Sequence, residues 1–217
     1  MDIDMGFHMD RKTKVGVVLF NEVEVLDFAG PFEVFSVATF LGTNQSAFEV
    51  STVGQTGEMI SARNGLQVLP HFSFSNAPDY DVLIVPGGFG ADEVERYNAT
   101  MINWIQAREK SVKILASVCT GAFILAEAGF LNKKEATSHW MDIDKLQSEY
   151  PQIQVRHSVK FVDEGHIITA GGISAGINMS LYIVSRLLGS DVAIETAKRM
   201  EYDLDPRELD VCVSEND

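Results

Sequence analysis

A strand-to-helix corner is predicted within the segment Lys113-Ile-Leu-Ala-Ser-Val-Cys-Thr-Gly-Ala-Phe-Ile-Leu-Ala-Glu-Ala-Gly129. Its first half, Ile114 to Val118, is a short apolar run typical of a fully buried strand. Its second half, Ala122 to Ala128, is rich in helix-forming residues, and Gly129 suits the position just after a helix end. The segment therefore predicts a buried strand that turns directly into a helix.

Cys119 occupies the corner itself and is followed by Thr120 and Gly121. A side chain at such a corner is held on a sharp turn, and the next backbone N–H points the same way. This is the geometry of a nucleophile elbow, with cysteine where hydrolases place serine. Because a helix N-terminus favours an anion, we expect the thiolate of Cys119 to form more readily than in a free cysteine. The alternative is an unreactive cysteine that packs as a small hydrophobic side chain.

Chain length, cysteine count, hydropathy and net charge limit the classes of protein to which this chain can belong. With 217 residues, the chain is long enough for one large domain with a substantial core. Its two cysteines, Cys119 and Cys212, show neither disulfide nor zinc spacing, which favours a reducing cytoplasm. No apolar run approaches the ~18 residues of a membrane span. The net charge of −14 argues against a nucleic-acid-binding surface. We therefore expect a cytoplasmic protein that binds neither membrane nor nucleic acid.

Strand and helix patterns alternate along most of the chain. Strands are predicted at 14–20, 48–53, 80–85 and 114–118, with a hairpin at 159–169, and helices at about 31–41, 98–109, 122–128, 141–149, 175–188 and 190–201. This alternation predicts an α/β, doubly wound, mostly parallel sheet with helices on both faces. Residues 14–201 are expected to form one domain, preceded by a flexible leader at 1–13. Residues 202–217 are expected to form a loose acidic tail.

Three candidate site positions follow predicted strands. Asp27 comes after the first strand, Gly87 and Gly88 after the third, and Cys119 after the fourth. Ligands in such folds bind beyond the carboxyl ends of the strands, so these residues predict an active site at that edge. The glycines match neither a phosphate loop nor a dinucleotide motif, but they allow close approach of backbone N–H donors. Asp27 could instead only cap the helix expected to begin at Pro31.

His139 is a further candidate, as a general base. It precedes Trp140, and a lone histidine beside a tryptophan is more often structural. Both interpretations stay open from the sequence.

Five motifs together resemble the ThiJ/PfpI family of the class-I glutamine amidotransferase-like superfamily. They are Leu26-Asp-Phe-Ala-Gly-Pro31, Leu83-Ile-Val-Pro-Gly-Gly88, Ala116-Ser-Val-Cys-Thr-Gly-Ala122, Ala136-Thr-Ser-His-Trp140 and Thr169-Ala-Gly-Gly-Ile-Ser-Ala-Gly176. The resemblance covers about residues 14–201. It implies a flavodoxin-like fold and a homodimer with the site near the interface. It also implies a small-molecule substrate, with neither metal nor organic cofactor.

The resemblance also implies roles for individual residues. Cys119 corresponds to the nucleophile, Asp27 to its acidic partner and Thr120 to an assisting residue. Gly88 and Thr120 would supply backbone donors to a developing charge, and Gly87 and His139 would line the site.

Two departures from the family pattern matter. Thr120 stands where peptidase-like members have histidine, which argues against a Cys-His protease dyad. Asn178 stands where aspartate is frequent in the family, which would alter packing or dimer contacts there.

Within the family, the Cys-Thr-Gly elbow with the Leu-Asp-Phe-x-Gly-Pro motif is similar to isonitrile hydratases. We therefore expect hydration of an isonitrile, such as cyclohexyl isocyanide, to an N-substituted formamide through a thioimidate on Cys119. One alternative is glyoxalase- or deglycase-like chemistry on reactive aldehydes. Another is a redox- or ligand-sensing protein, because the motifs are also similar to sensor domains of AraC-type regulators. That class needs a DNA-binding domain beyond Glu201, where we expect only the acidic tail.

Overall fold

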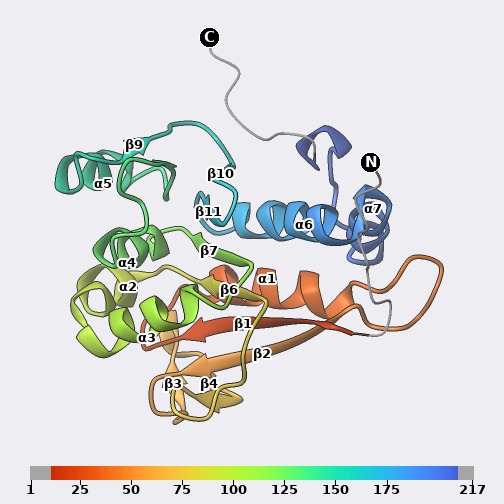
Figure 1. Ribbon diagram of the computed structural model, residues 1–217, viewed down its shortest axis with the longest axis horizontal. Helices are drawn as coiled ribbons and strands as arrows, with labels where there is room; N and C mark the ends of the chain where they lie inside the picture. The colour runs from red at the N-terminus through yellow and green to blue at the C-terminus, as the bar shows by residue number, and fades with distance from the viewer. Residues whose placement is uncertain (1–10, 210–217) are drawn as a thin grey trace.

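The computed structural model describes residues 11–209, which are built around a seven-stranded sheet (Figure 1). The strands lie in the order β10-β11-β7-β6-β1-β2-β5. Their bounds are β1 (Thr13–Leu19), β2 (Phe48–Gly54), β5 (Phe72–Ser73), β6 (Val82–Val85), β7 (Ile114–Val118), β10 (Phe161–Asp163) and β11 (Ile167–Ala170). Two short pairs stand apart from it: β3 (Ile60–Ser61) with β4 (Gln67–Val68), and β8 (Glu135–Ala136) with β9 (Gln154–Val155).

Neighbouring strands of the main sheet are parallel, except for the antiparallel pair β10 and β11. The predicted hairpin is therefore confirmed. Strand β1, next to the central strand β6, pairs with β2 on one side and with β6 on the other, so that Val15 lies between Val50 and Val82. The strands that follow β1 in the sequence therefore lie on both sides of it, with β2 and β5 on one side and β6 and β7 on the other. Such a switch point leaves a crevice at the carboxyl ends of the strands, which is where α/β proteins bind ligands.

Seven α-helices are found in the described part of the chain: α1 (Val25–Val37), α2 (Phe89–Glu93), α3 (Ala99–Glu109), α4 (Gly121–Glu127), α5 (Ile143–Glu149), α6 (Ala175–Leu188) and α7 (Ser190–Arg199). α1, α6 and α7 pack against one another, and α2 packs against α4 on the other side of the sheet (Figure 1). Strands β6 and β7 between these layers are fully buried. The predicted doubly wound α/β fold is confirmed.

The helix predicted to begin at Pro31 begins instead at Val25 and ends at Val37, not near Leu41. Asp27 therefore lies inside the first turn of α1 rather than before the helix, and its side chain does not act as a cap. Pro31 favours a first turn but is tolerated further along, at the cost of one helical hydrogen bond. Burial of Phe28 and Phe35 in the core favours the longer helix.

The segment predicted as a loose tail packs against the domain as far as Leu209, which is buried. The Tyr202 hydroxyl donates a hydrogen bond to Asn178 Oδ1 at 3.0 Å. Asn178, which lies on α6, therefore has a structural partner in the segment that follows α7. A short 3-10 turn, Pro206–Leu209, then packs against α6 and α7. Cys212 lies outside the described residues.

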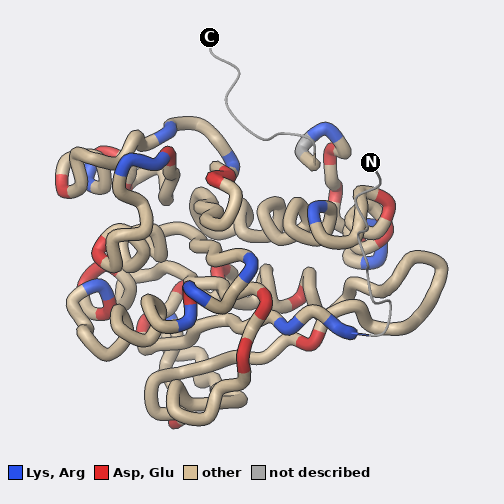
Figure 2. The backbone as a smooth tube through the Cα atoms, viewed as in Figure 1, with Lys and Arg blue, Asp and Glu red and all other residues tan. Residues whose placement is uncertain are grey.

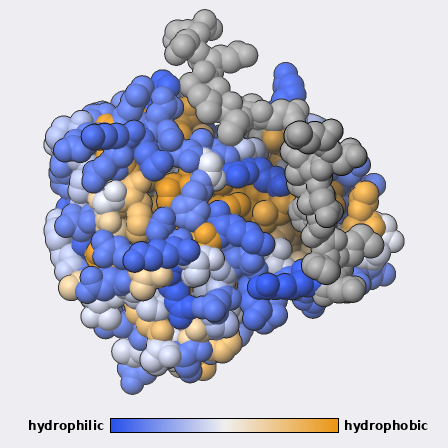
Figure 3. Space-filling view, in the orientation of Figure 1, coloured by the Kyte–Doolittle hydropathy of each residue, from blue (hydrophilic) through white to orange (hydrophobic). Residues whose placement is uncertain are grey.

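Lysines and arginines are dispersed among aspartates and glutamates along the backbone (Figure 2). Hydrophilic residues dominate the face seen in Figure 3, and apolar surface gathers in patches near its middle. Over residues 11–209, the helices are all too short or too polar to cross a bilayer.

The corner between β7 and α4 is closely packed against the end of β6. A Cβ atom at Gly121 would lie 2.2 Å from the carbonyl oxygen of Val85, far inside van der Waals contact. Only glycine therefore allows α4 to begin where it does. At the other end of the helix, Gly129 has a φ of 85° and space around its Cα.

We expect Gly121→Ala to destabilise the fold by roughly 1–3 kcal/mol, because the added methyl meets backbone that cannot rotate away. Gly129→Ala is the matched control: its cost, roughly 1 kcal/mol, comes from backbone conformation alone. Chemical denaturation measures both. Gly121→Ala should also change the alkylation rate of Cys119, whereas Gly129→Ala should not. Equal thiol reactivity in the two variants would contradict a tightly constrained corner.

Candidate active site

Cys119 is held in the predicted elbow between β7 and α4. Its φ of 56° lies in the left-handed region, which costs a non-glycine residue about 1–2 kcal/mol. Its N–H donates to the carbonyl oxygens of Ala170 (3.1 Å) and Gly171 (3.0 Å), so the end of β11 fixes the strained turn. The side chain is almost buried, with 6% of the residue exposed. The structure thus fixes a strained, nearly enclosed thiol beyond the sheet edge.

Asp27 is brought to this thiol by the first turn of α1. The residue is completely buried, and its Oδ2 accepts a hydrogen bond from the Gly87 N–H at 3.0 Å. Its Oδ1 has no hydrogen-bond partner of normal geometry among the described residues. The Cys119 thiol and the Ile173 N–H both approach the carboxyl group. Asp27 and Cys119 therefore form a directly interacting buried pair.

Burial raises the pKa of Asp27 to about 7, and the charge of Glu24 acts in the same direction. The bond from the Gly87 N–H opposes this rise only in part. Burial and the Asp27 carboxylate also raise the pKa of the Cys119 thiol, against the effect of the Thr120 N–H. The expectation that the thiolate of Cys119 forms more readily than in a free cysteine is therefore wrong. Protons leave this site as steps of a coupled pair.

Thr120 and the two glycines join the elbow to the end of β6. The Thr120 hydroxyl donates to the Gly88 carbonyl oxygen (3.0 Å) and lies 2.9 Å from the Gly88 N–H, which donates to Oγ1. A Cβ atom at Gly87 would lie 2.5 Å from the Thr120 nitrogen. In this resting arrangement the Gly88 N–H is engaged by Thr120 and the Gly87 N–H by Asp27. The Thr120 N–H is the donor that faces Cys119.

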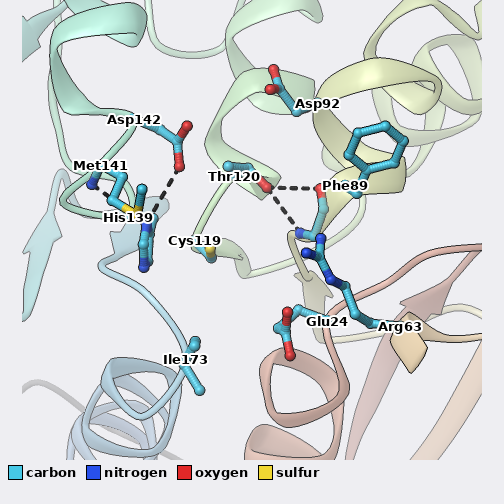
Figure 4. Close-up of a pocket in the computed structure, with 11 residues that line it drawn as sticks. Glu24, Arg63, Phe89, Asp92, Cys119, Thr120, His139, Met141, Asp142 and Ile173 are labelled. Carbon is cyan, nitrogen blue, oxygen red and sulfur yellow. Dashed lines mark hydrogen bonds and ion pairs between the residues drawn. The ribbon is translucent and has the colours of Figure 1, made fainter. Parts of the chain in front are cut away.

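His139 lies on the opposite wall of the pocket from Arg63, as Figure 4 shows. Its Nδ1 is 3.4 Å from Asp142 Oδ2. Its ring packs against Gly172, where a Cβ atom would lie 2.1 Å from His139 Cδ2. The structure thus places His139 beside the site, oriented by Asp142.

A cavity of about 350 Å³ opens above Cys119 (Figure 4). Its lining consists of Glu24, Arg63, Gly88, Phe89, Asp92, Cys119, Thr120, His139, Met141, Asp142 and Ile173. Seven of these were not predicted from the sequence: Glu24, Arg63, Phe89, Asp92, Met141, Asp142 and Ile173. Ile173 could have been predicted as a site residue, because it follows the glycine pair Gly171-Gly172 after a predicted strand. Its φ of 52° is a strained conformation for a β-branched residue.

Within residues 11–209, no group of three or more histidine, cysteine or acidic side chains is arranged to hold a metal ion. The described residues offer a thiol that lines a small, partly apolar cavity and contacts a buried carboxyl group behind it.

The elevated Asp27 pKa predicts a pH-dependent stability. Folding raises this pKa from 3.8 to about 7, so the folded state binds the proton more tightly between these values. The free energy of unfolding must therefore fall as pH rises from about 4 to about 7. Asp27→Asn does not titrate, so its stability relative to wild type should increase across this range and then level off.

Urea denaturation at a series of pH values measures the effect. Asp144→Asn, at an exposed position on α5, is the matched control and should show no comparable trend. A stability difference between wild type and Asp27→Asn that stays constant from pH 4 to pH 8 would contradict the elevated pKa.

The sequence of this chain is similar to those of several known proteins. The sequence profile of the DJ-1/PfpI family matches residues 13–186. The chain is 32% identical over 189 residues to isonitrile hydratase of Pseudomonas putida, covering 87% of this chain and 78% of that protein. It is 26% identical over 190 residues to the HTH-type transcriptional regulator GbdR of Pseudomonas aeruginosa, covering 87% of this chain but only 50% of the regulator.

Among solved structures, a ThiJ/PfpI family protein from Pseudomonas syringae superposes with a TM-score of 0.79 at 27% identity, covering 95% of this chain and 84% of that one. The profile match spans the whole sheet and most of α6, including every predicted site residue. As the motifs implied, the chain belongs to the DJ-1/PfpI family.

Proposed function

We propose that this protein hydrates a small isonitrile to the N-substituted formamide, with Cys119 as nucleophile. The observation that carries the proposal is the buried contact between Asp27 and Cys119, whose thiol side also lines a small cavity. The similarity to isonitrile hydratase over most of both chains supports it. The reaction needs a nucleophile for the terminal isonitrile carbon and one group that both gives and takes a proton.

In the first step, the sulfur of Cys119 bonds to the isonitrile carbon. The proton held by the pair moves from Asp27 to that carbon, which gives a neutral thioimidate, R–N=CH–S–Cys119. Because the pair shares its proton internally, thiolate forms without releasing a proton to water. The Thr120 N–H and the N-terminus of α4 stabilise the charge on sulfur.

In the second step, Asp27, now a carboxylate, takes a proton from water as the water oxygen bonds to the thioimidate carbon. Asp27 passes this proton to the nitrogen, which gives the tetrahedral intermediate R–NH–CH(OH)–S–Cys119. The intermediate then expels the Cys119 sulfur as a thiolate while Asp27 takes the proton of the hydroxyl group, and the formamide, R–NH–CHO, leaves. The proton gained by Asp27 restores the resting pair, so the net reaction adds one water to one isonitrile.

Thr120 positions the loop after β6 through its two contacts with Gly88. His139 would line the substrate pocket rather than replace Asp27, because Asp27 is the acidic group that approaches the thiol.

We further propose that the protein forms a homodimer with the site near the interface. Five exposed apolar side chains support this, because they lie in the site loops or next to them: Leu26, Phe89, Trp140, Met141 and Ile173. The free thiol of Cys119 fits a reducing compartment such as the cytoplasm. Sedimentation analysis should give twice the chain mass, and a strictly monomeric protein would contradict the dimer.

A sensing function is the second candidate, because the match to GbdR covers the same share of this chain, 87%, as the match to isonitrile hydratase. The chain spans about half of that regulator, so only the portion held in common is comparable. A sensor would bind its ligand in the same cavity without turnover.

The direct test follows N-cyclohexylformamide formation from cyclohexyl isocyanide by the reduced protein. Cys119→Ala should lower kcat by a factor on the order of 10³ or more, because the covalent route is lost. Asp27→Ala should lower it by roughly 10²–10⁴, the usual contribution of general acid–base catalysis. Cys212→Ala is the matched control and should retain wild-type turnover. Near-normal activity of Cys119→Ser would contradict the mechanism.

If the wild type with reduced Cys119 turns over no isonitrile, lactate formation from methylglyoxal tests aldehyde chemistry. Inactivity in both assays, with ligand binding retained, would favour the sensing function.

The pH profile gives an independent prediction. Below about pH 7 the pair holds both protons, so no thiolate is available. We expect kcat/KM to rise with pH through an apparent pKa near 7 and to reach a plateau above it. In Asp27→Asn the residual activity should lose this step. A profile that is flat from pH 5 to pH 8 would contradict the role of Asp27.

A further inference from the structure

Arg63 is placed at the pocket by a rigid turn between β3 and β4. Its N–H donates to the Val23 carbonyl oxygen at 2.9 Å, and the Ala62 N–H donates to that of Leu66 at 2.8 Å. Ala62 is completely buried, so the turn is anchored in the core directly before Arg63. The guanidinium points into the pocket from the wall opposite His139 and Met141 (Figure 4). Its backbone is thus fixed, and its side chain reaches the substrate space.

Among the described residues, three acidic groups also line the pocket, and two of them, Asp92 and Asp142, have partners in the protein. Asp92 forms ion pairs with Lys145 (2.6 Å) and Arg96 (3.6 Å). Asp142 lies 3.4 Å from the Nδ1 of His139.

Arg63 has no carboxylate within ion-pair distance (4.0 Å) in the described part of the chain. Glu24 lines the same cavity without reaching it. A guanidinium is always charged and presents a fork of N–H donors that matches a carboxylate in two parallel hydrogen bonds. An unpaired guanidinium in a substrate cavity is therefore a binding group for an anion.

We propose that Arg63 binds a carboxylate carried by the substrate, while the reacting carbon lies at Cys119. The charge balance favours a carboxylate over a phosphate. One guanidinium matches the single charge of a carboxylate, whereas a dianion would add a second negative charge to a cavity that already holds Glu24. The inference rests on the proposed function for the identity of the reacting group, but recognition of the carboxylate is tested without turnover.

Two alkylating reagents of nearly equal size provide that test. Iodoacetate carries a carboxylate and iodoacetamide a neutral amide, and both transfer their carbon to the thiolate with loss of iodide. Rates are measured at Cys119 in a Cys212→Ser background, so that a single thiol reacts. Arg63→Gln should lower the ratio of the iodoacetate rate to the iodoacetamide rate by roughly tenfold, the scale of one charge-assisted contact.

Two further variants separate charge recognition from damage to the turn. Arg63→Lys keeps the charge but not the fork, and should retain an intermediate ratio. Lys110→Gln removes one positive charge at an exposed position remote from the pocket and should leave the wild-type ratio. An unchanged ratio in Arg63→Gln, or an equal fall in Lys110→Gln, would overturn the proposal.

Substrate preference is then measured with ω-isocyano carboxylates of increasing chain length against their primary amides. Wild type should prefer one carboxylate by roughly tenfold or more in kcat/KM, and Arg63→Gln should lose that preference while retaining turnover of the amide. Equal turnover of acid and amide by the wild type would overturn the role of Arg63 and leave the hydratase function standing. Failure to turn over any isonitrile, with the alkylation preference present, would overturn the hydratase function alone.

Discussion

The buried contact between the Asp27 carboxyl and the Cys119 thiol is the interaction on which the rest of the site depends. It is energetically unfavourable for two neighbouring groups that are both removed from water to be ionised at once. They therefore exchange a proton with each other before they exchange one with solvent. Burial raises both pKa values, that of Asp27 to about 7. This contact lowers the free energy of unfolding at neutral pH. It also places a proton donor, Asp27, directly beside the nucleophile, Cys119.

The fold makes this contact by bringing backbone together more closely than most side chains would allow. Gly87 lies against the Thr120 nitrogen, and Gly121 lies against the end of β6. The left-handed residues Cys119 and Ile173 turn the chain sharply after β7 and β11. All four positions lie beyond the carboxyl ends of neighbouring parallel strands, where the chain must reverse into a helix. Strain and close packing are therefore concentrated at the edge of the sheet that carries the chemistry.

The sequence predicted the longer strands of the main sheet and the longer helices, and it predicted that Cys119, Asp27 and the glycine pair lie near one edge of the sheet, because each of these follows a buried apolar run. It did not predict the short elements β5, β8, β9 and α2. It misplaced the start of α1, because the local preference of Pro31 for a first turn was outweighed by burial of Phe28 and Phe35 in the core. It also misjudged the thiol, because desolvation and the neighbouring Asp27 are products of tertiary structure. Arg63 could not be predicted: its turn is a common hairpin signal, and only the packing of the β3–β4 pair against Val23 brings it to the cavity.

The central claim is that buried Asp27 stays a carboxylic acid until about pH 7. Difference infrared spectroscopy of wild type against Asp27→Asn tests it directly, because a protonated carboxyl has a C=O stretch distinct from that of a carboxylate. The account predicts a carboxylic acid band at pH 5 that is present in the wild type, absent in the variant and lost with a midpoint near pH 7. If no such band exists at pH 5, Asp27 is already ionised there, and the shared-proton pair is contradicted.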